Sequence, residues 1–353
     1  MNPRIKWLRD KLNAQSIDGM IVNNNYNITY LTGLVAEGTL LITKKENLFI
    51  TDSRYIEEVN AFLTIDDEIT VADVRGYSKY DYENFFAFCE NVGFEENVVT
   101  YAKYRKIQEL YKCSNLVETE YIIERLRVAK EEEEIEYIKK ASEITDKCFS
   151  HLLKYMKKGM TELQIANEIK NFFNENGSNG LSFEPIVASG PNSSKPHAQP
   201  TDRIIESGDI ILIDMGCKVN GYCSDMTRTV FVDEITEEMK KQYAFVSDLQ
   251  NQLINLVRDG RAIKDIVLLS ENNYSMTRNM MMHSMGHGIG LECHELPFLT
   301  KHNMANLKEN MTIAIEPGIY IEAKWGIRIE DTILVQKTGC NILTKSNKEI
   351  III

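Results

Sequence analysis

The dipeptide Asn220-Gly221 lies between two apolar runs in IILIDMGCKVNGYCSDMTRTV, residues 210–230. Asn-Gly at such a position is typical of a two-residue β-hairpin turn, because both residues tolerate the positive φ that this turn needs. A turn there fixes the register of the two strands and sets Asp214 opposite Thr227. Asp225 then lies on the same face, diagonal to Asp214. We therefore expect a long antiparallel hairpin with two acidic side chains on one face.

Asp214 and Asp225 interrupt apolar strands, where an ionised carboxylate is costly unless a cation or hydrogen bonds compensate for it. Diagonal neighbours in an antiparallel pair are about 7–8 Å apart at the backbone, so two side chains that lean together can share a cation. For either aspartate alone, a purely structural role is as good an explanation as a cation ligand, with one a surface acid near a turn and the other a hydrogen-bonded acid of the core. Only the pair indicates a cation site.

A second acidic pair occurs in EPGIYIEAKWGIRIE, residues 316–330. A chain reversal centred near Ala323 would set Glu316 opposite Glu330, and their even separation puts both side chains on one face. Each glutamate alone could be a solvated charge at the end of a strand. Their interpretation as ligands therefore depends on the other acids of the predicted site.

The stretch HSMGHGIGLECHE, residues 283–295, contains three histidines and three glycines. The glycines allow close backbone approach around His287. Four carboxylates without a cation would repel one another, whereas four carboxylates and one imidazole form the ligand set of a two-metal hydrolytic site. The predicted ligands of two divalent ions are Asp214, Asp225, His287, Glu316 and Glu330. Oxygen-rich ligation favours Mn²⁺, Co²⁺ or Fe²⁺ over a closed zinc site, and Mn²⁺ is our expectation.

The length of 353 residues predicts two domains, because a single hydrophobic core seldom grows beyond about 250–300 residues. Residues 1–125 mix short apolar runs with helical stretches and are expected to form an α/β domain. DGMIVNN and TLLITKKENLFIT are expected to be strands, and YDYENFFAFCENVGF a helix. Residues 126–353 are expected to form an α+β domain of helices packed on a largely antiparallel sheet.

The second domain is expected to begin with a long amphipathic helix from residue 129. Its acidic first turn, EEEE at residues 131–134, suits the helix dipole and is expected to be solvated. Thr161 and Gln164 have capping-box spacing and predict the start of the next helix. Further helices are expected at about 236–258 and 262–275.

The net charge of −12 opposes binding to nucleic acid phosphates and anionic lipid. No apolar run approaches the roughly 20 residues that cross a bilayer, and the N-terminus lacks the apolar segment of a signal peptide. The seven cysteines are widely spread without a C-x-x-C pair, which is typical of reduced thiols in a cytosolic protein. We expect a cytoplasmic protein without nucleic acid or membrane partners.

These motifs resemble the "pita-bread" metallopeptidases of family M24. The Xaa-Pro aminopeptidase and prolidase branch of this family has segments similar to PHAQPTDRIIESGDIILIDMG, GYCSDMTRTVF, HSMGHGIGLECHELP, IEPGIYI and GIRIEDTILV. NITYLTGL and TDSRY are similar to the N-terminal domain of that branch. The resemblance implies a creatinase-like α/β domain over residues 1–125, a pita-bread catalytic domain over residues 126–353, and a homodimer.

For the metal ligands, the resemblance implies that Asp225 and Glu330 bridge both ions. Asp214 would chelate one ion, and His287 with Glu316 would complete the other. Glu316 is also the implied acid or base that moves the proton of the attacking water.

Four further residues have implied roles in catalysis or substrate binding. His197 and His294 match the family's non-ligand histidines that hold the substrate and the tetrahedral intermediate. His283 matches a further histidine of the substrate pocket, and Arg328 could steady the metal carboxylates or the substrate by bidentate hydrogen bonding. The alternatives are a loop histidine for His197, a satisfied core histidine for His283 and a surface arginine for Arg328.

The implied activity is hydrolysis of the Xaa-Pro bond at the N-terminus of peptides. The alternative within the branch is a prolidase that cleaves Xaa-Pro dipeptides. Methionine aminopeptidase is disfavoured because it lacks an N-terminal domain of this type. The five retained ligands disfavour both metal-free creatinase-like hydrolysis and a non-catalytic binding module.

Overall fold

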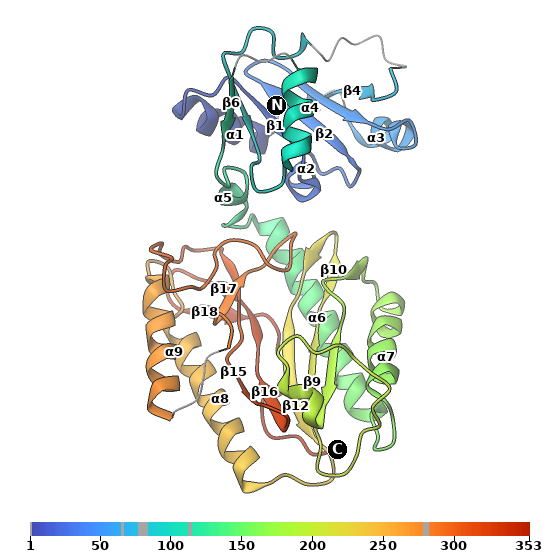
Figure 1. The fold of residues 1–353 in the computed structure, drawn as a ribbon, viewed down its shortest axis with the longest axis vertical. Coiled ribbons are helices and arrows are strands. Elements are labelled where there is room, and N and C mark those ends of the chain that lie inside the picture. The colour runs from blue at the N-terminus through green and yellow to red at the C-terminus, as the bar shows by residue number, and fades with distance from the viewer. Residues whose placement is uncertain (1, 65–66, 77–83, 112–114, 278–281) are drawn as a thin grey trace. The chain divides into compact units, whose positions relative to one another are not determined.

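The computed structural model describes residues 2–64, 67–76, 84–111, 115–277 and 282–353. The chain divides into two compact units, Met1–Arg127 and Val128–Ile353 (Figure 1). Within the described residues, no helix is long and apolar enough to cross a membrane. Met280 and Met281 lie outside the described residues.

The N-terminal unit is built on a six-stranded mixed sheet in the order β4-β3-β2-β1-β5-β6. Its strands are β1 (Gly19–Val22), β2 (Gly38–Thr43), β3 (Asn47–Thr51), β4 (Thr70–Asp73), β5 (Asn91–Phe94) and β6 (Asn115–Glu118). Its helices are α1 (Pro3–Ala14), α2 (Asn25–Thr32), α3 (Ile56–Phe62), α4 (Tyr101–Leu110) and α5 (Glu124–Arg127). The predicted α/β class and the strands at DGMIVNN and TLLITKKENLFIT are confirmed.

The helix predicted over residues 80–94 is wrong in its described part. Residues 84–90 form turns and bends, and Asn91–Phe94 is strand β5, which pairs in parallel with β1 and β6. Among the aromatic residues that suggested a helix, Phe86 is fully buried against the sheet whereas Phe88 is exposed. Residues 80–83 of that prediction lie outside the described residues.

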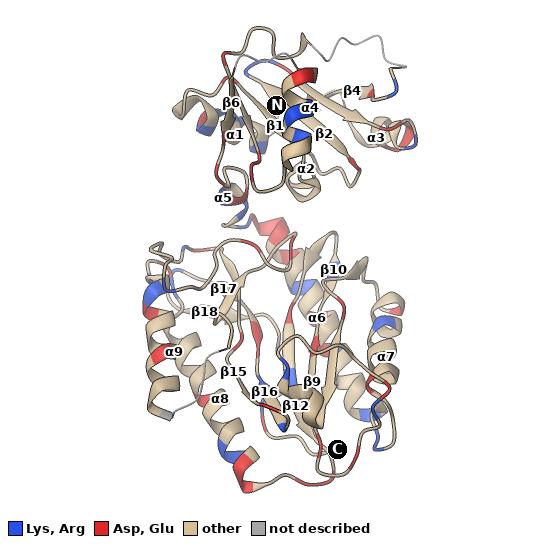
Figure 2. Cartoon of the chain, in the orientation of Figure 1, with Lys and Arg blue, Asp and Glu red and all other residues tan. Residues whose placement is uncertain are grey.

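Within the described residues of the second unit, the long helices are α6 (Glu132–Tyr155), α7 (Glu162–Glu175), α8 (Glu237–Leu256) and α9 (Ile263–Thr277). All four predicted helices are confirmed, including the capping box of Thr161 with Gln164. Acidic residues gather in the first turn of α6 (Figure 2). The expectation that this turn is solvated is wrong for Glu134, which is buried and accepts a hydrogen bond of 2.7 Å from the hydroxyl of Tyr222.

The predicted Asn220-Gly221 hairpin is present, with φ values of 47° and 83° at the turn. It contains β9 (Ile210–Met215), β10 (Cys217–Val219), β11 (Tyr222–Cys223) and β12 (Met226–Phe231). Asp214 lies opposite Thr227, as predicted. β9 and β12 form a three-stranded sheet with β8 (Ile186–Ser189), whereas β10 and β11 belong to a second sheet with β7 (Gly180–Leu181). Asp225 lies where the hairpin passes from one sheet to the other.

The second hairpin also turns at the predicted place, with Ala323 at φ 58°. It contains β14 (Thr312–Ile315), β15 (Gly318–Ile321), β16 (Trp325–Arg328) and β17 (Asp331–Val335). β14 and β17 belong to a four-stranded sheet with β13 (Gly286–Gly288) and β18 (Cys340–Ile342), and β15 pairs with β16 alone. Glu316 and Glu330 therefore also lie at an interruption between two sheets.

Two hydrophobic clusters support these hairpins. One packs α6 and α7 on β8, β9 and β12, and the other packs α8 and α9 on β14 to β17. Figure 1 shows these two pairs of helices on either side of the strands. In this α+β arrangement, the acidic residues at the strand interruptions of both hairpins lie between the two pairs of helices.

Candidate metal centre

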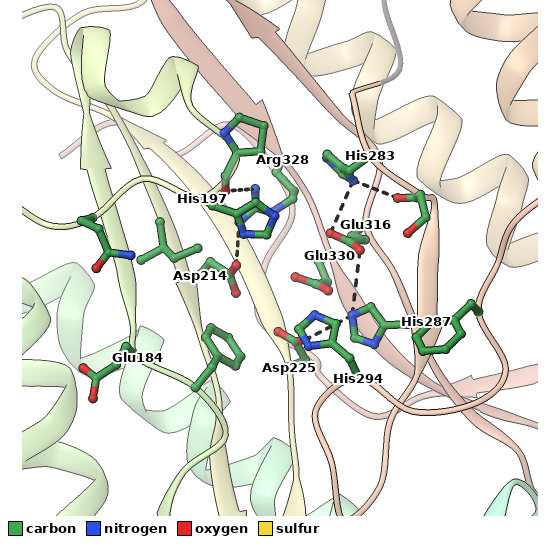
Figure 3. Close-up of a pocket in the computed structure, with 16 residues that line it drawn as sticks. Glu184, His197, Asp214, Asp225, His283, His287, His294, Glu316, Arg328 and Glu330 are labelled. Carbon is green, nitrogen blue, oxygen red and sulfur yellow. Dashed lines mark hydrogen bonds and ion pairs between the residues drawn. The ribbon is translucent and has the colours of Figure 1, made fainter. Parts of the chain in front are cut away.

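A cavity of about 540 Å³ lies between the two hairpins (Figure 3). Its lining contains every residue that the sequence predicted for the site: His197, Asp214, Asp225, His283, His287, His294, Glu316, Arg328 and Glu330. Phe183, Ile186 and Phe298 add apolar surface, and Glu184 lies at the same wall. The structure thus brings together residues that are up to 133 positions apart, from His197 to Glu330.

Asp225, His287 and Glu330 form the compact centre of this cavity. Each offers one ligand atom, and these atoms all lie within 4.8 Å of one another. His287 Nε2 is 3.6 Å from Asp225 Oδ2, and all three side chains are buried. Such a group of nitrogen and oxygen donors is a candidate metal site.

Glu316 and Asp214 flank this centre on different sides (Figure 3). Glu316 Oε1 is 3.8 Å from His287 Nε2, and Glu316 Oε2 is 3.7 Å from His283 Nδ1. Asp214 Oδ2 instead accepts a hydrogen bond of 2.6 Å from Arg328 Nη2. Asp214 therefore lies in the cavity but outside the compact group of three ligand atoms.

Burial of these acids raises their pKa values. The pKa values of Asp225 and Glu330 are raised well above their ordinary values, first by burial and then by neighbouring carboxylates. Burial raises the pKa of Glu316 to about 7, despite the opposing charge of Arg328. Without a cation, this set of acids therefore favours protonation over full ionisation.

Two oxygen atoms show that the residues present suit a metal ion. Asp214 Oδ1 and Asp225 Oδ1 are both buried and accept no hydrogen bond from the described residues. A buried acceptor without a partner is costly, and a divalent cation would satisfy both atoms. The donor set thus fits divalent metal binding.

The orientation of His287 also suits a ligand. Its Nδ1 lies 3.1 Å from the carbonyl oxygen of Gly288, which can only accept a hydrogen bond, so Nδ1 carries the proton. Nε2, which faces Asp225 and Glu316, then holds the lone pair. Burial lowers the pKa of His287 to about 4, so the imidazole is neutral at pH 7.

His283 is oriented by a chain of hydrogen bonds. Its Nδ1 lies 2.8 Å from the carbonyl oxygen of Ser284, so Nδ1 donates and Nε2 accepts a bond of 2.9 Å from the hydroxyl of Tyr320. That hydroxyl accepts in turn from Arg328 Nη1 at 2.7 Å. Burial lowers the pKa of His283 to about 4, and its side chain lines the cavity although both ring nitrogens have hydrogen-bond partners in the protein.

His294 and His197 lie on the more open side of the cavity. The rings of His294 and His287 are 4.2 Å apart between centroids, with His294 exposed. Burial lowers the pKa of His294 as well. His197 is an exposed residue of the cavity lining, beside the buried Ala198. Both imidazoles are therefore accessible to a ligand in the cavity.

Arg328 is buried rather than a surface arginine, and it contacts the proposed metal ligand Asp214 through one nitrogen. One nitrogen, Nη2, donates to Asp214, while Nε donates to Thr227 Oγ1 at 3.0 Å. Nη1 donates to Tyr320 and to the carbonyl oxygen of Pro196 at 3.1 Å. The guanidinium thus donates hydrogen bonds to several parts of the cavity wall instead of donating two to one carboxylate.

Three residues that contact the site were not predicted from the sequence. Thr227 Oγ1 donates to Glu330 Oε2 at 2.7 Å, Cys293 Sγ donates to Asp225 Oδ2 at 3.2 Å, and Tyr320 connects Arg328 with His283. The position of Tyr320 could have been found, because residues 316, 318 and 320 share one face of a strand. The contact of Thr227 crosses between the two hairpins, and that of Cys293 joins the first hairpin to the segment after β13, so neither had a local signal.

The profile of metallopeptidase family M24 matches residues 136–337, and that of the creatinase/prolidase N-terminal domain matches residues 4–129. The chain belongs to metallopeptidase family M24. The predicted resemblance is thereby confirmed, as is the fold class of a creatinase-type N-terminal domain followed by a pita-bread domain.

Individual M24 proteins resemble the chain over nearly its whole length. The uncharacterized peptidase YqhT of Bacillus subtilis is 35% identical, with 99% of this chain and 100% of the relative covered. The structure of an Xaa-Pro dipeptidase from Bacillus anthracis has a TM-score of 0.93 and 33% identity, with 99% of both chains covered. An X-Pro aminopeptidase from Thermotoga maritima has a TM-score of 0.89 and 29% identity, again with 99% of both chains covered.

Proposed function

We propose that this M24 protein is a dinuclear-metal-dependent aminopeptidase that hydrolyses the Xaa-Pro bond at the N-terminus of peptides. The observation that carries the proposal is the convergence of four carboxylates and one neutral imidazole on one cavity. Retention of all five donors argues against a non-catalytic or metal-free member of the fold.

The residues proposed to hold two divalent ions are Asp214, Asp225, His287, Glu316 and Glu330. Mn²⁺ is the proposed ion, with Co²⁺ or Fe²⁺ as alternatives, because the donors are mainly carboxylate oxygens. Bound ions of this kind lower the pKa of water and polarise a peptide carbonyl, which is the chemistry that hydrolysis requires.

The other side chains supply proton transfer and substrate contacts. Glu316 lies between His287 and His283, where its carboxylate can exchange a proton with the attacking water. His294 and His197 are accessible from the cavity and can donate to the developing oxyanion. His283 and Arg328 would then shape the pocket that receives the substrate.

The hydrogen bonds that Arg328 already makes within the protein favour an aminopeptidase over a dipeptidase. A dipeptide ends in a carboxylate directly after proline, and a cation in the cavity would stabilise its binding. Among the described residues that line the cavity, Arg328 is the sole lysine or arginine, and each of its three nitrogens already donates to the protein. A longer peptide carries no charge at that point and needs no such cation.

The second candidate is an Xaa-Pro dipeptidase. It is favoured by the likeness to the Bacillus anthracis structure of that name, and a neighbouring subunit could supply the cation. A homodimer and a cytoplasmic location stay predictions from the sequence.

A comparison of two substrates tests the proposal. The Mn²⁺-loaded protein would receive an Xaa-Pro dipeptide or the matching Xaa-Pro-Yaa tripeptide, with a chelator control and analysis of the products. The aminopeptidase proposal expects faster cleavage of the tripeptide, releasing the residue before proline. Faster cleavage of the dipeptide would favour the second candidate, and cleavage of neither would contradict both.

A further inference from the structure

Lys130 and Glu295 form a buried ion pair behind the metal centre. Lys130 Nζ is 2.9 Å from Glu295 Oε1, and the two side chains are only 1% and 4% exposed. Nζ also donates to the carbonyl oxygen of Val128 at 3.1 Å. Burial of an ion pair usually gives little net stability, because desolvation offsets the attraction of the charges. Stability alone is therefore a weak reason for charges at these two positions.

The carboxylate of Glu295 organises the segment from His287 to Glu295, here called the histidine segment. Glu295 Oε2 accepts a hydrogen bond of 3.3 Å from the backbone N–H of Glu292. The carboxylate also lies directly over Gly290, where an added Cβ would overlap its oxygens. The segment thus folds around one carboxylate, which Lys130 holds in place from the start of the catalytic unit.

The histidine segment transmits this constraint to the proposed metal ligand. The carbonyl oxygen of Gly288 accepts hydrogen bonds from the backbone N–H of Glu295 at 2.9 Å and from His287 Nδ1 at 3.1 Å. The first bond depends on the position of Glu295, and the second sets the direction of His287 Nε2. At the C-terminal end of the histidine segment, His294 immediately precedes Glu295, and its ring centroid lies 4.2 Å from that of His287.

We propose that Lys130 and Glu295 are a positioning pair that fixes the orientation of His287 and His294. Neither residue is among the described residues that line the cavity, so the pair acts through the histidine segment. The two charges contribute more to metal affinity and substrate contact than to folding stability. The inference rests on the proposed metal-dependent function, because it assigns His287 as a ligand.

The test compares single variants with a neutral double variant. Lys130→Met and Glu295→Leu each leave one buried charge unpaired, so each loses stability as well as Mn²⁺ affinity. The double variant Lys130→Met/Glu295→Leu replaces the pair by apolar groups, and its melting temperature is expected to return near that of the wild type. Its Mn²⁺ affinity, measured by titration calorimetry, is expected to stay about 10–100-fold weaker, because the Gly288 carbonyl that orients His287 loses the support of Glu295. In peptidase assays at saturating Mn²⁺, kcat should fall more than KM rises.

Ile169→Ala is the matched control. It removes buried methyl groups between α7 and the sheet, far from the histidine segment in the chain, and so lowers the melting temperature while preserving Mn²⁺ affinity. A double variant that binds Mn²⁺ as tightly as the wild type would overturn the positioning role. Absence of Mn²⁺ binding to the wild type would instead refute the proposed function itself.

Discussion

Thr227 joins the two acidic hairpins through Glu330. Its hydroxyl donates to Glu330 Oε2 at 2.7 Å, and its carbonyl oxygen accepts from the backbone N–H of Glu330 at 3.1 Å. Because Thr227 lies opposite Asp214 in the first hairpin, this contact sets the separation of acids that belong to different hairpins. The geometry of the proposed metal centre therefore depends on a neutral residue that lies beside the ligands.

Thr227→Val should weaken metal binding. The substitution keeps the shape of the side chain but removes the donor to Glu330 and the acceptor for Arg328 Nε. Loss of such an outer hydrogen bond typically costs about 10–100-fold in metal affinity. Titration of the chelator-treated variant with Mn²⁺ would measure this, and Thr227→Ser should retain the wild-type affinity. Equal affinity in the valine variant would mean that Glu330 is positioned by other contacts.

Tyr320→Phe should reduce turnover without reducing metal content. The Tyr320 hydroxyl accepts a hydrogen bond from Arg328 Nη1 and donates one to His283 Nε2. Its removal therefore leaves His283 Nε2 without its donor. One hydrogen bond of about 1–1.5 kcal/mol corresponds to a fall of roughly tenfold in kcat/KM. Steady-state kinetics together with metal analysis would separate the two effects. A loss of bound metal equal to the loss of activity would argue against a role confined to His283.

Titration of Glu316 should lower the stability of the metal-free protein as pH rises from 5 to 7. Its folded-state pKa is raised to about 7, so over this range Glu316 binds more protons in the folded than in the unfolded state. With an ordinary pKa of 4.5 in the unfolded state, Glu316 contributes a loss of about 2 kcal/mol between pH 5 and pH 7. His283 and His287, whose pKa values are lowered to about 4, contribute with the opposite sign, so the comparison with a Glu316 variant isolates the effect.

Thermal melting of the metal-free protein across this pH range would measure the effect. Between pH 5 and pH 7 the wild type should lose more stability, relative to Glu316→Gln, because the variant lacks the titrating group, and saturating Mn²⁺ should reduce this contribution by replacing the proton of Glu316. A wild-type profile that runs parallel to that of the glutamine variant would contradict the assignment.

Gly288→Ala should destabilise the catalytic unit. An added Cβ would overlap the carbonyl oxygen of Leu296, which is backbone and cannot move away cheaply. Overpacking of this kind costs about 1–3 kcal/mol or more. Gly339→Ala is the control, because its Cβ would meet no atom within 4 Å and carries only the strain of a φ of 83°. Urea denaturation should show the larger loss for Gly288→Ala, and equal losses would exclude the steric explanation.

The register of both hairpins could be predicted because it is set locally. Asn220-Gly221 admits the positive φ values of a tight turn, and a reversal near Ala323, where the structure has a positive φ, sets Glu316 opposite Glu330. Once these turns are placed, the faces of Asp214, Asp225, Glu316 and Glu330 follow from the two-residue period of a strand. The choice of acidic residues for the site therefore needed little knowledge of tertiary structure.

The rest depends on contacts between distant segments. Glu134 looks like a solvated helix start in the sequence, but Tyr222 from the first hairpin covers it and donates to its carboxylate. The strand Asn91–Phe94 was mistaken for helix because the aromatic residues before it, of which Phe86 is buried and Phe88 exposed, have a spacing that suits a helix. Arg328 was placed on the correct face, yet its division among several acceptors depends on Pro196 and Tyr320.

The most direct test of the account is a titration of chelator-treated protein with Mn²⁺, followed by cleavage of an Xaa-Pro-Yaa tripeptide. We predict negligible activity without metal and a rise to a plateau at about two equivalents of Mn²⁺ per chain, as expected for a two-metal site. Asp225→Asn, folded by circular dichroism, should lose most of that activity at every metal concentration. Full activity in the metal-free protein, or in folded Asp225→Asn, would contradict the proposed metal centre.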